Sequence, residues 1–293
     1  MPILTQGPDP NPKAPRLRCP PGACDSHIHL FGPAEKYPFA ADSPYTSRDA
    51  LPETFIALQN KLGLGRAVIV SPGAYGRDYR LLADTLERFP DRFRGIALMS
   101  EATAAAEFAR LTRLGVRGLR MMSAKRGPHV PHYSRDVAMR AADHGWHVQF
   151  YPHDTDIVDY ADKLLALPNT IVLDHFAGIP AARGVDQPAM HTVKKMLDTG
   201  RVWVKLSAPM RCTKQNLPYP EVTPLAHALV RHAPQRLVWA TDWPHVNLDG
   251  REMPNDGDLL DLLTEWVPDG ATRHRILVDN PCALYGFPPA AKP

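Results

Sequence analysis

The sequence predicts an α/β protein that folds as a single, slightly distorted (β/α)8 TIM barrel, and three observations support this. Eight short apolar runs alternate with longer helical patterns over most of the 293 residues, an arrangement and a length typical of such barrels. The runs lack strict alternation of polar and apolar residues, as expected for parallel strands covered on both faces. No GxGxxG motif follows an early run, which disfavours an open dinucleotide-binding sheet.

The order of the elements follows from these patterns. Residues 1–22 are rich in proline and lack a hydrophobic period, so we expect an extended tail there and the barrel over residues 23–293. The expected strands are 24–30, 66–72, 93–99, 116–122, 146–152, 170–176, 202–208 and 236–244. The expected helices are 53–63, 78–90, 103–115, 134–145, 156–167, 189–200 and 222–234, several of which end near Gly or Pro.

Composition narrows the possible partners and location. The net charge is +3 and the basic residues are scattered, which argues against a nucleic-acid surface. The sequence has neither a signal-peptide pattern nor an apolar run long enough to span a membrane. The four cysteines form no CxxC pair, which is typical of reduced thiols. We therefore expect a cytoplasmic protein with no membrane, nucleic-acid or protein partner implied.

Candidate catalytic residues stand where the expected strands end, which is where barrel enzymes carry their chemistry. His27 and His29 are two residues apart and share one face of the first strand. His175 ends the sixth strand and Asp242 ends the eighth. The alternatives are a buried structural histidine pair and, for Asp242, a helix cap. A carboxylate among apolar residues is costly without a partner or a task, which favours function.

The remaining strand ends carry groups suited to an acidic ligand. Arg120 lies in the fourth strand and Lys125 and Arg126 follow it, while Arg211 follows the seventh strand. Arginine binds carboxylates through paired hydrogen bonds of fixed geometry. Surface ion pairs are the alternative, and for Lys125 the favoured one. The arginines therefore predict a small acidic substrate.

The four candidate catalytic residues are also a plausible ligand set for a single Zn²⁺. Tyr151 ends the fifth strand and is a poor ligand for Zn²⁺, and His153 would reach the centre only if its loop curled back. No lysine ends the fourth strand, which disfavours a binuclear centre. The pattern predicts that no metal is required and that a single Zn²⁺ remains possible, bound by His27, His29, His175 and Asp242.

These motifs resemble the amidohydrolase superfamily and, within it, the lactonases of the 2-pyrone-4,6-dicarboxylate type. The resemblance runs from about Cys24 to Tyr285 and is carried by DSHIHLFGP, YTSRDA, GLRMMSAKR, GWHVQFYP, LDH, TDWPH and DNPCALY. It implies a metal-independent hydrolase that opens an acidic lactone during the catabolism of aromatic acids. It also implies a role for each candidate residue: Asp242 as general base on water, His27, His29 and His175 polarising the carbonyl, Arg120, Arg126 and Arg211 binding acid groups, and Tyr45, Ser71 and Tyr151 orienting the ring.

One position departs from the lactonase pattern, and it keeps other functions open. Gly178 stands where the dicarboxylate lactonases have arginine, and Arg77 is a candidate replacement. A 4-sulfomuconolactone hydrolase, or another hydrolase or isomerase of acidic lactones, is therefore an alternative. A mononuclear metal-dependent decarboxylase or amidohydrolase is a second, and a non-catalytic barrel that binds an acid is a third.

Overall fold

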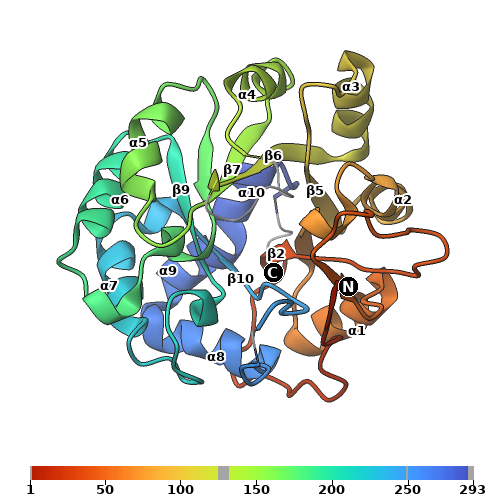
Figure 1. Cartoon of the computed structure of the whole chain (residues 1–293). Helices are drawn as coiled ribbons and strands as arrows, with labels where there is room; N and C mark the ends of the chain where they lie inside the picture. Colours follow the sequence, from red (N-terminus) through yellow and green to blue (C-terminus); the bar gives the residue numbers. More distant parts are fainter. Residues whose placement is uncertain (1, 125–131, 249, 290–293) are drawn as a thin grey trace.

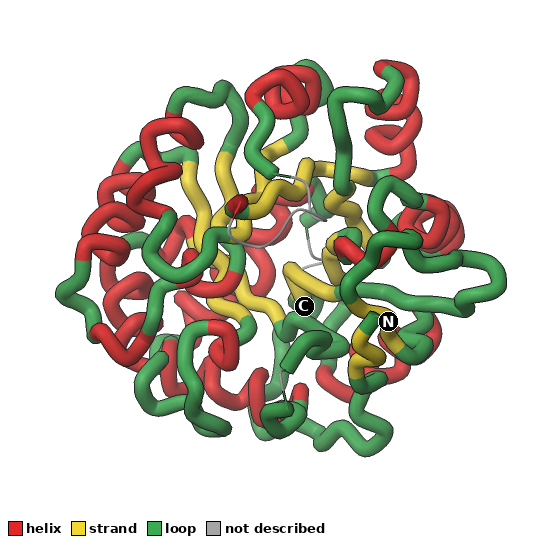
Figure 2. The backbone as a smooth tube through the Cα atoms, in the orientation of Figure 1, coloured by secondary structure: helices red, strands yellow, loops and turns green. Residues whose placement is uncertain are grey.

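The structure, a computed structural model, describes residues 2–124, 132–248 and 250–289. Within them, eight parallel strands form one sheet, and each pairs with the next of the eight along the chain. Helices surround this sheet in Figure 1 and Figure 2. The strands are β2 (Cys24–Ile28), β4 (Arg66–Val70), β5 (Phe93–Ala97), β6 (Val116–Met122), β7 (His147–Tyr151), β8 (Ile171–Leu173), β9 (Val202–Ser207) and β10 (Leu237–Ala240). The predicted (β/α)8 barrel is confirmed.

A helix follows each of these eight strands in the described part of the chain. The helices are α1 (Pro52–Leu62), α2 (Arg80–Arg88), α3 (Ala105–Leu114), α4 (Arg135–Ala142), α5 (Ile157–Leu165), α6 (Pro188–Asp198), α7 (Thr223–His232) and α8 (Asp256–Trp266). Proline stands in the first turn of α1, α6 and α7, where its fixed φ suits the helix and its missing N–H costs nothing. Gly63 and Gly115 end α1 and α3 in the left-handed conformation, which glycine adopts without strain.

The barrel closes where its first and last strands meet. The amide of Asp242 donates to the carbonyl of His27 at 3.0 Å, and the amide of His29 donates to the carbonyl of Trp243 at 2.8 Å. The buried carboxylate of Asp25 accepts a 2.6 Å hydrogen bond from the Thr241 hydroxyl and so ties β2 to the end of β10. This seam places the backbone of the two candidate histidines beside that of the candidate aspartate.

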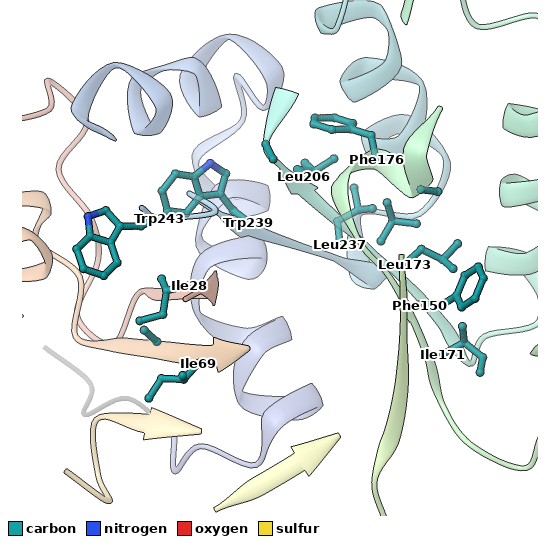
Figure 3. Packing of buried hydrophobic residues seen from close by; sticks show 14 of the residues in the cluster. Ile28, Ile69, Phe150, Ile171, Leu173, Phe176, Leu206, Leu237, Trp239 and Trp243 are labelled. Carbon is teal, nitrogen blue, oxygen red and sulfur yellow. The ribbon is translucent and has the colours of Figure 1, made fainter. Parts of the chain in front are cut away.

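Apolar side chains cover both faces of the strands. Ile69 joins the main core cluster, whereas Val68 and Val70, on either side of it, pack with Tyr285. Figure 3 shows part of the main cluster. Tyr285 belongs to the C-terminal segment made of α9 (Gly270–His274), a π-helical turn (Arg275–Asp279) and α10 (Asn280–Tyr285). Burial on both faces explains why the strands read as continuous apolar runs.

The N-terminal segment is more structured than a plain extended tail. β1 (Ile3–Thr5) pairs in parallel with β3 (Tyr45–Ser47) in a separate two-stranded sheet. Further along, the Lys13 ammonium lies 2.6 Å from the Asp258 carboxylate of α8. The segment thus connects the loop after β2 with the helix after β10.

The predicted strands differ from the observed ones mainly at their carboxyl ends. The run 170–176 contains β8 only over Ile171–Leu173, and the run 236–244 contains β10 only over Leu237–Ala240. After each short strand the backbone leaves the sheet, with positive φ at His175 and Asp242. Among the described residues, no helix is both long enough and apolar enough to cross a bilayer.

Candidate active site

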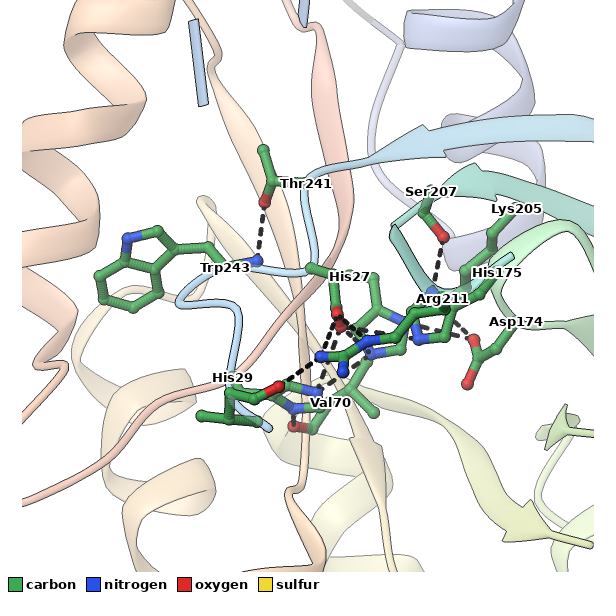
Figure 4. Close-up of polar contacts among 12 residues, drawn as sticks. His27, His29, Val70, Asp174, His175, Lys205, Ser207, Arg211, Thr241 and Trp243 are labelled. Atoms are coloured by element: carbon green, nitrogen blue, oxygen red, sulfur yellow. Dashed lines mark hydrogen bonds and ion pairs between the residues drawn. The ribbon is translucent and has the colours of Figure 1, made fainter. Parts of the chain in front are cut away.

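Four buried side chains converge at the carboxyl ends of β2, β8 and β10. His27 lies in β2 and His29 just beyond it, His175 begins the short turn after β8, and Asp242 follows β10 by two residues. Asp242 Oδ1 lies 3.6 Å from the Nε2 atom of each histidine. The Nε2 atoms of His27 and His29 are 3.3 Å apart. Figure 4 shows the three imidazoles turned toward one region, and the structure thus brings together the four residues singled out in the sequence.

Each imidazole is oriented by a contact at its other nitrogen. His29 Nδ1 lies 2.7 Å from the carbonyl oxygen of Val70, and His175 Nδ1 lies 2.9 Å from the Ser207 hydroxyl. His27 Nδ1 lies 3.2 Å from Lys205 Nζ. Burial lowers the pKa of all three histidines, that of His175 to about 4. The imidazoles are therefore neutral at pH 7, with Nε2 facing the centre.

Asp242 remains ionised in this buried setting. Burial alone would raise the pKa of its carboxyl, but the neighbouring His175 and Arg211 outweigh that effect and hold the pKa well below its usual value. Arg211 contacts Asp242 Oδ2 through Nη2 at 3.1 Å and Nε at 3.3 Å. Oδ1 therefore faces the histidines while Oδ2 is bound to a cation, and Asp242 presents one oxygen as a proton acceptor.

A second charged group lies beneath His27, inside the barrel, and none of its members was among the predicted site residues. Lys205 on β9 and Asp174 at the end of β8 are both fully buried, with 3.3 Å between Nζ and Oδ1. The Gln149 side chain joins them, accepting from Lys205 Nζ at 2.7 Å and donating to Asp174 Oδ2 at 3.1 Å. Burial lowers the pKa of Lys205 to about 8, although Asp174 opposes this.

A signal for this charged group is present in the sequence. Lys205 and Ser207 occupy alternate positions in the otherwise apolar run VWVKLS, so they share one face of the strand. A lysine on a face that also carries a polar residue at the strand end points to the barrel interior rather than to solvent. The sequence gives no comparable signal for Asp174. It lies next to His175 at a strand end, where the face on which each side chain lies is difficult to infer.

Three of the predicted substrate-binding residues, Arg120, Tyr151 and Arg211, lie beside the same centre. The Arg120 guanidinium lies 5.7 Å from the centre of the Tyr151 ring, and this ring lies 4.8 Å from that of His175 in an edge-to-face arrangement. Arg120 is buried, and its Nε has no hydrogen-bond partner among the described residues. Ser71 is buried directly after β4. Tyr45 lies on β3, and burial raises the pKa of its hydroxyl to about 12, so it stays protonated.

Other residues considered in the sequence lie elsewhere. Lys125 and Arg126 fall outside the described residues. His153 is exposed after β7, away from the buried centre. Arg77 is exposed and lines a cleft of about 400 Å³ beside Glu101, whereas a side chain at Gly178 would meet the carbonyls of Pro152 and Asp154. The structure therefore places Arg77 and Gly178 in different surroundings, which gives no support to Arg77 as the replacement cation.

The converging atoms fit a single metal ion. In the described residues, one cluster has metal-ligand geometry, and its ligand atoms on His27, His175 and Asp242 lie within 4.8 Å of one another. Nitrogen and carboxylate donors suit Zn²⁺, whose bonds of about 2.0–2.1 Å place tetrahedral ligand atoms roughly 3.4 Å apart. The separations of 3.3 Å and 3.6 Å around His27, His29 and Asp242 are close to this value.

Comparisons with known proteins agree with this architecture. The amidohydrolase family matches residues 24–287. A 4-sulfomuconolactone hydrolase from Rhizobium radiobacter is 35% identical, over 96% of this chain and 95% of that protein. A 2-pyrone-4,6-dicarboxylate hydrolase from Comamonas testosteroni is 36% identical, over 94% of this chain and 93% of that protein. The apo crystal structure of an Agrobacterium tumefaciens protein, 27% identical, superposes with a TM-score of 0.82 and covers 94% of this chain and 100% of that chain.

Proposed function

The chain belongs to the amidohydrolase family, and we propose that it is a hydrolase that opens the ring of a small acidic lactone in the breakdown of aromatic acids. The observation that carries this proposal is the convergence of three neutral imidazoles on one oxygen of an ionised Asp242. Two relatives of near-complete coverage are named for the hydrolysis of such compounds. Arginines beside the centre suit the acid groups of the substrate.

The proposed reaction uses Asp242 as general base. Its Oδ1 accepts a proton from water while the water oxygen bonds to the lactone carbonyl carbon. His27 and His175 polarise the carbonyl and stabilise the negative charge that develops on its oxygen. His29 orients His27 through the 3.3 Å contact between their Nε2 atoms. When the intermediate collapses, the bond from the carbonyl carbon to the ring oxygen breaks, and that oxygen takes up the proton held by Asp242. The product is an open-chain acid.

Binding of the acid groups is assigned to Arg120, Arg126 and Arg211. We expect Arg120→Met to raise KM for an acidic lactone about 10–100-fold, the loss typical of a hydrogen bond to a charged group, with a smaller change in kcat. Arg77→Met is the matched control, since Arg77 is exposed in a different cleft, and its kinetics should equal those of the wild type. Steady-state kinetics of the two variants test the assignment.

Arg211 should behave differently from Arg120, because it also contacts Asp242 Oδ2 at 3.1 Å. Arg211→Met is therefore expected to raise KM and to lower kcat together. If both Arg120→Met and Arg211→Met left KM unchanged, the assignment of these arginines to the acid groups of the substrate would be wrong.

The pH dependence of kcat/KM identifies the group that acts as general base. Asp242 acts as its carboxylate, and its pKa is held well below the usual 3.8. We therefore expect kcat/KM of chelator-treated protein to stay level as the pH falls from 7 to about 4, the region where His175 also remains neutral, and to fall only below it. An acidic limb centred between pH 6 and 7 would instead indicate a histidine base and contradict the assignment of Asp242.

We propose that the reaction requires no metal, because the neutral imidazoles and Asp242 together supply donors and a base. If Zn²⁺ is bound, His27, His29, His175 and Asp242 would hold it, and the ion would polarise the carbonyl and acidify water. The test is metal content and lactone turnover before and after chelation. Full turnover by the metal-free protein excludes the alternative of a metal-dependent decarboxylase or amidohydrolase. Loss of turnover, with recovery on added Zn²⁺, supports that alternative.

A further inference from the structure

A chain of hydrogen bonds runs through the His27–His29 pair, and one of its ends has a fixed direction. The carbonyl of Val70 can only accept, so His29 Nδ1, 2.7 Å away, carries a hydrogen and donates it. A neutral His29 then has a lone pair on Nε2. The Nε2 of His27 lies 3.3 Å from this atom in hydrogen-bonding geometry. A hydrogen bond between these two atoms requires His27 to be the donor, with its hydrogen on Nε2.

The other end of the chain has the complementary direction. A neutral His27 with hydrogen on Nε2 has a lone pair on Nδ1, and Lys205 Nζ lies 3.2 Å from Nδ1. An ammonium group can only donate, so Lys205 Nζ donates to the lone pair on His27 Nδ1. The donor Lys205 at one end and the acceptor Val70 at the other are compatible with one arrangement: hydrogen on Nε2 of His27 and on Nδ1 of His29.

Asp174 is the competing partner of His27 Nδ1. Its Oδ1 lies at the same distance, 3.2 Å, and would favour the opposite tautomer by accepting a hydrogen from Nδ1. Lys205 Nζ lies within hydrogen-bond distance of Nδ1, and the same ammonium is paired with Asp174 Oδ1 at 3.3 Å. The negative charge of Asp174 is therefore already compensated without a hydrogen from His27. Gln149 Oε1 also accepts a 2.7 Å hydrogen bond from Lys205 Nζ, which restrains the position of the ammonium group beside His27.

We propose that Lys205 is a positioning residue that fixes His27 as the tautomer with hydrogen on Nε2, and thereby makes His27 a hydrogen-bond donor to substrate and a poor metal ligand. A metal needs the Nε2 lone pair, so binding it requires His27 to move its hydrogen to Nδ1, against the Lys205 ammonium. The role of the donated hydrogen rests on the proposed function, but the tautomer and the metal affinity do not.

The first test is made on the wild-type protein, labelled with ¹⁵N in its histidines and freed of metal. Long-range ¹H–¹⁵N correlation spectra distinguish the two tautomers of each neutral imidazole, and His27→Gln and His29→Gln assign the signals. We expect hydrogen on Nε2 in His27 and on Nδ1 in His29. Hydrogen on Nδ1 of His27 would overturn the proposal. No substrate is needed, so this result is independent of whether any lactone is hydrolysed.

The second test is zinc affinity in Lys205→Met, measured by competition with a chelator. Without the ammonium, His27 Nδ1 can donate to Asp174 Oδ1, and we expect Zn²⁺ to bind about 10–100-fold more tightly, the range for changes in the groups that orient metal ligands. Arg120→Met is the matched control, because it removes a nearby buried cation that pairs with Asp174 Oδ2 at 3.5 Å rather than with His27. It should tighten zinc binding less and leave the His27 tautomer unchanged.

Two results would overturn the proposal. If Zn²⁺ bound more tightly to the same extent in Lys205→Met and Arg120→Met, the loss of a positive charge alone would explain the effect. If the affinity for Zn²⁺ were unchanged in Lys205→Met, Lys205 would have no influence on metal binding. If Lys205→Met fails to fold, the wild-type spectra decide. A retained Nε2 hydrogen in Lys205→Arg, which keeps donor groups at this position, would support hydrogen bonding as the cause.

Discussion

Asp242→Asn is expected to lower kcat for lactone hydrolysis by about 10²–10⁴-fold, the contribution typical of a general base. Asparagine has nearly the same shape, and its amide oxygen can still accept a hydrogen bond from Arg211, but it cannot take a proton from water. Substrate binding should therefore persist, with KM or Kd changed far less than kcat. Kinetics and ligand titration of the two proteins, with thermal unfolding as a check on folding, provide the measurement.

This experiment also distinguishes an enzyme from a barrel that only binds acids. A binding protein would show the same ligand affinity in both forms and no turnover in either. Asp242→Asn with full turnover would mean that another group activates the water, and the assignment of the base would be wrong.

Replacing His27 is expected to have the second-largest effect. His27→Asn should lower kcat by about 10²–10³-fold, as for the loss of one donor to a developing oxyanion. The asparagine amide reaches the place of Nδ1, beside Lys205, but not that of Nε2 at the centre. His27→Gln, one methylene longer, places its amide near Nε2 and should recover part of the loss.

The matched pair separates chemistry from packing. Both variants remove a fully buried ring that lies 4.7 Å from the ring of His175, so both should lower the thermal stability to a similar extent. If kcat fell equally in the two variants, the loss would come from altered packing, and the role of the Nε2 donor would be contradicted.

The barrel could be predicted from the sequence because its signals are local and repeated. Continuous apolar runs such as VRGLRMM and VWVKLS mark strands covered on both faces, and the helices between them begin or end at Pro and Gly. The strand ends were harder to place. His175 and Asp242 adopt positive φ, which is uncommon for residues other than glycine. A sequence pattern that favours continued strands therefore does not reveal these turns.

The site could be predicted only in part, for a related reason. His27 and His29 were found because two polar residues on one face of an apolar strand are conspicuous. Lys205 and Asp174 act through His27 from neighbouring strands, and such a contact depends on the register of the closed barrel, which a single sequence does not contain. The pairing of Arg211 with Asp242 likewise depends on how the loops after β9 and β10 approach each other.

The most direct test of the account is ring opening by metal-free protein. Chelator-treated wild type and Asp242→Asn are incubated with 2-pyrone-4,6-dicarboxylate, 4-sulfomuconolactone, muconolactones and aldarolactones, and loss of each lactone is followed by absorbance or NMR. We expect metal-free wild type to open at least one acidic lactone, and Asp242→Asn to open it at least about 10²-fold more slowly. Failure of the metal-free protein to open any of them, with decarboxylation or amide hydrolysis appearing once Zn²⁺ is restored, would contradict this expectation.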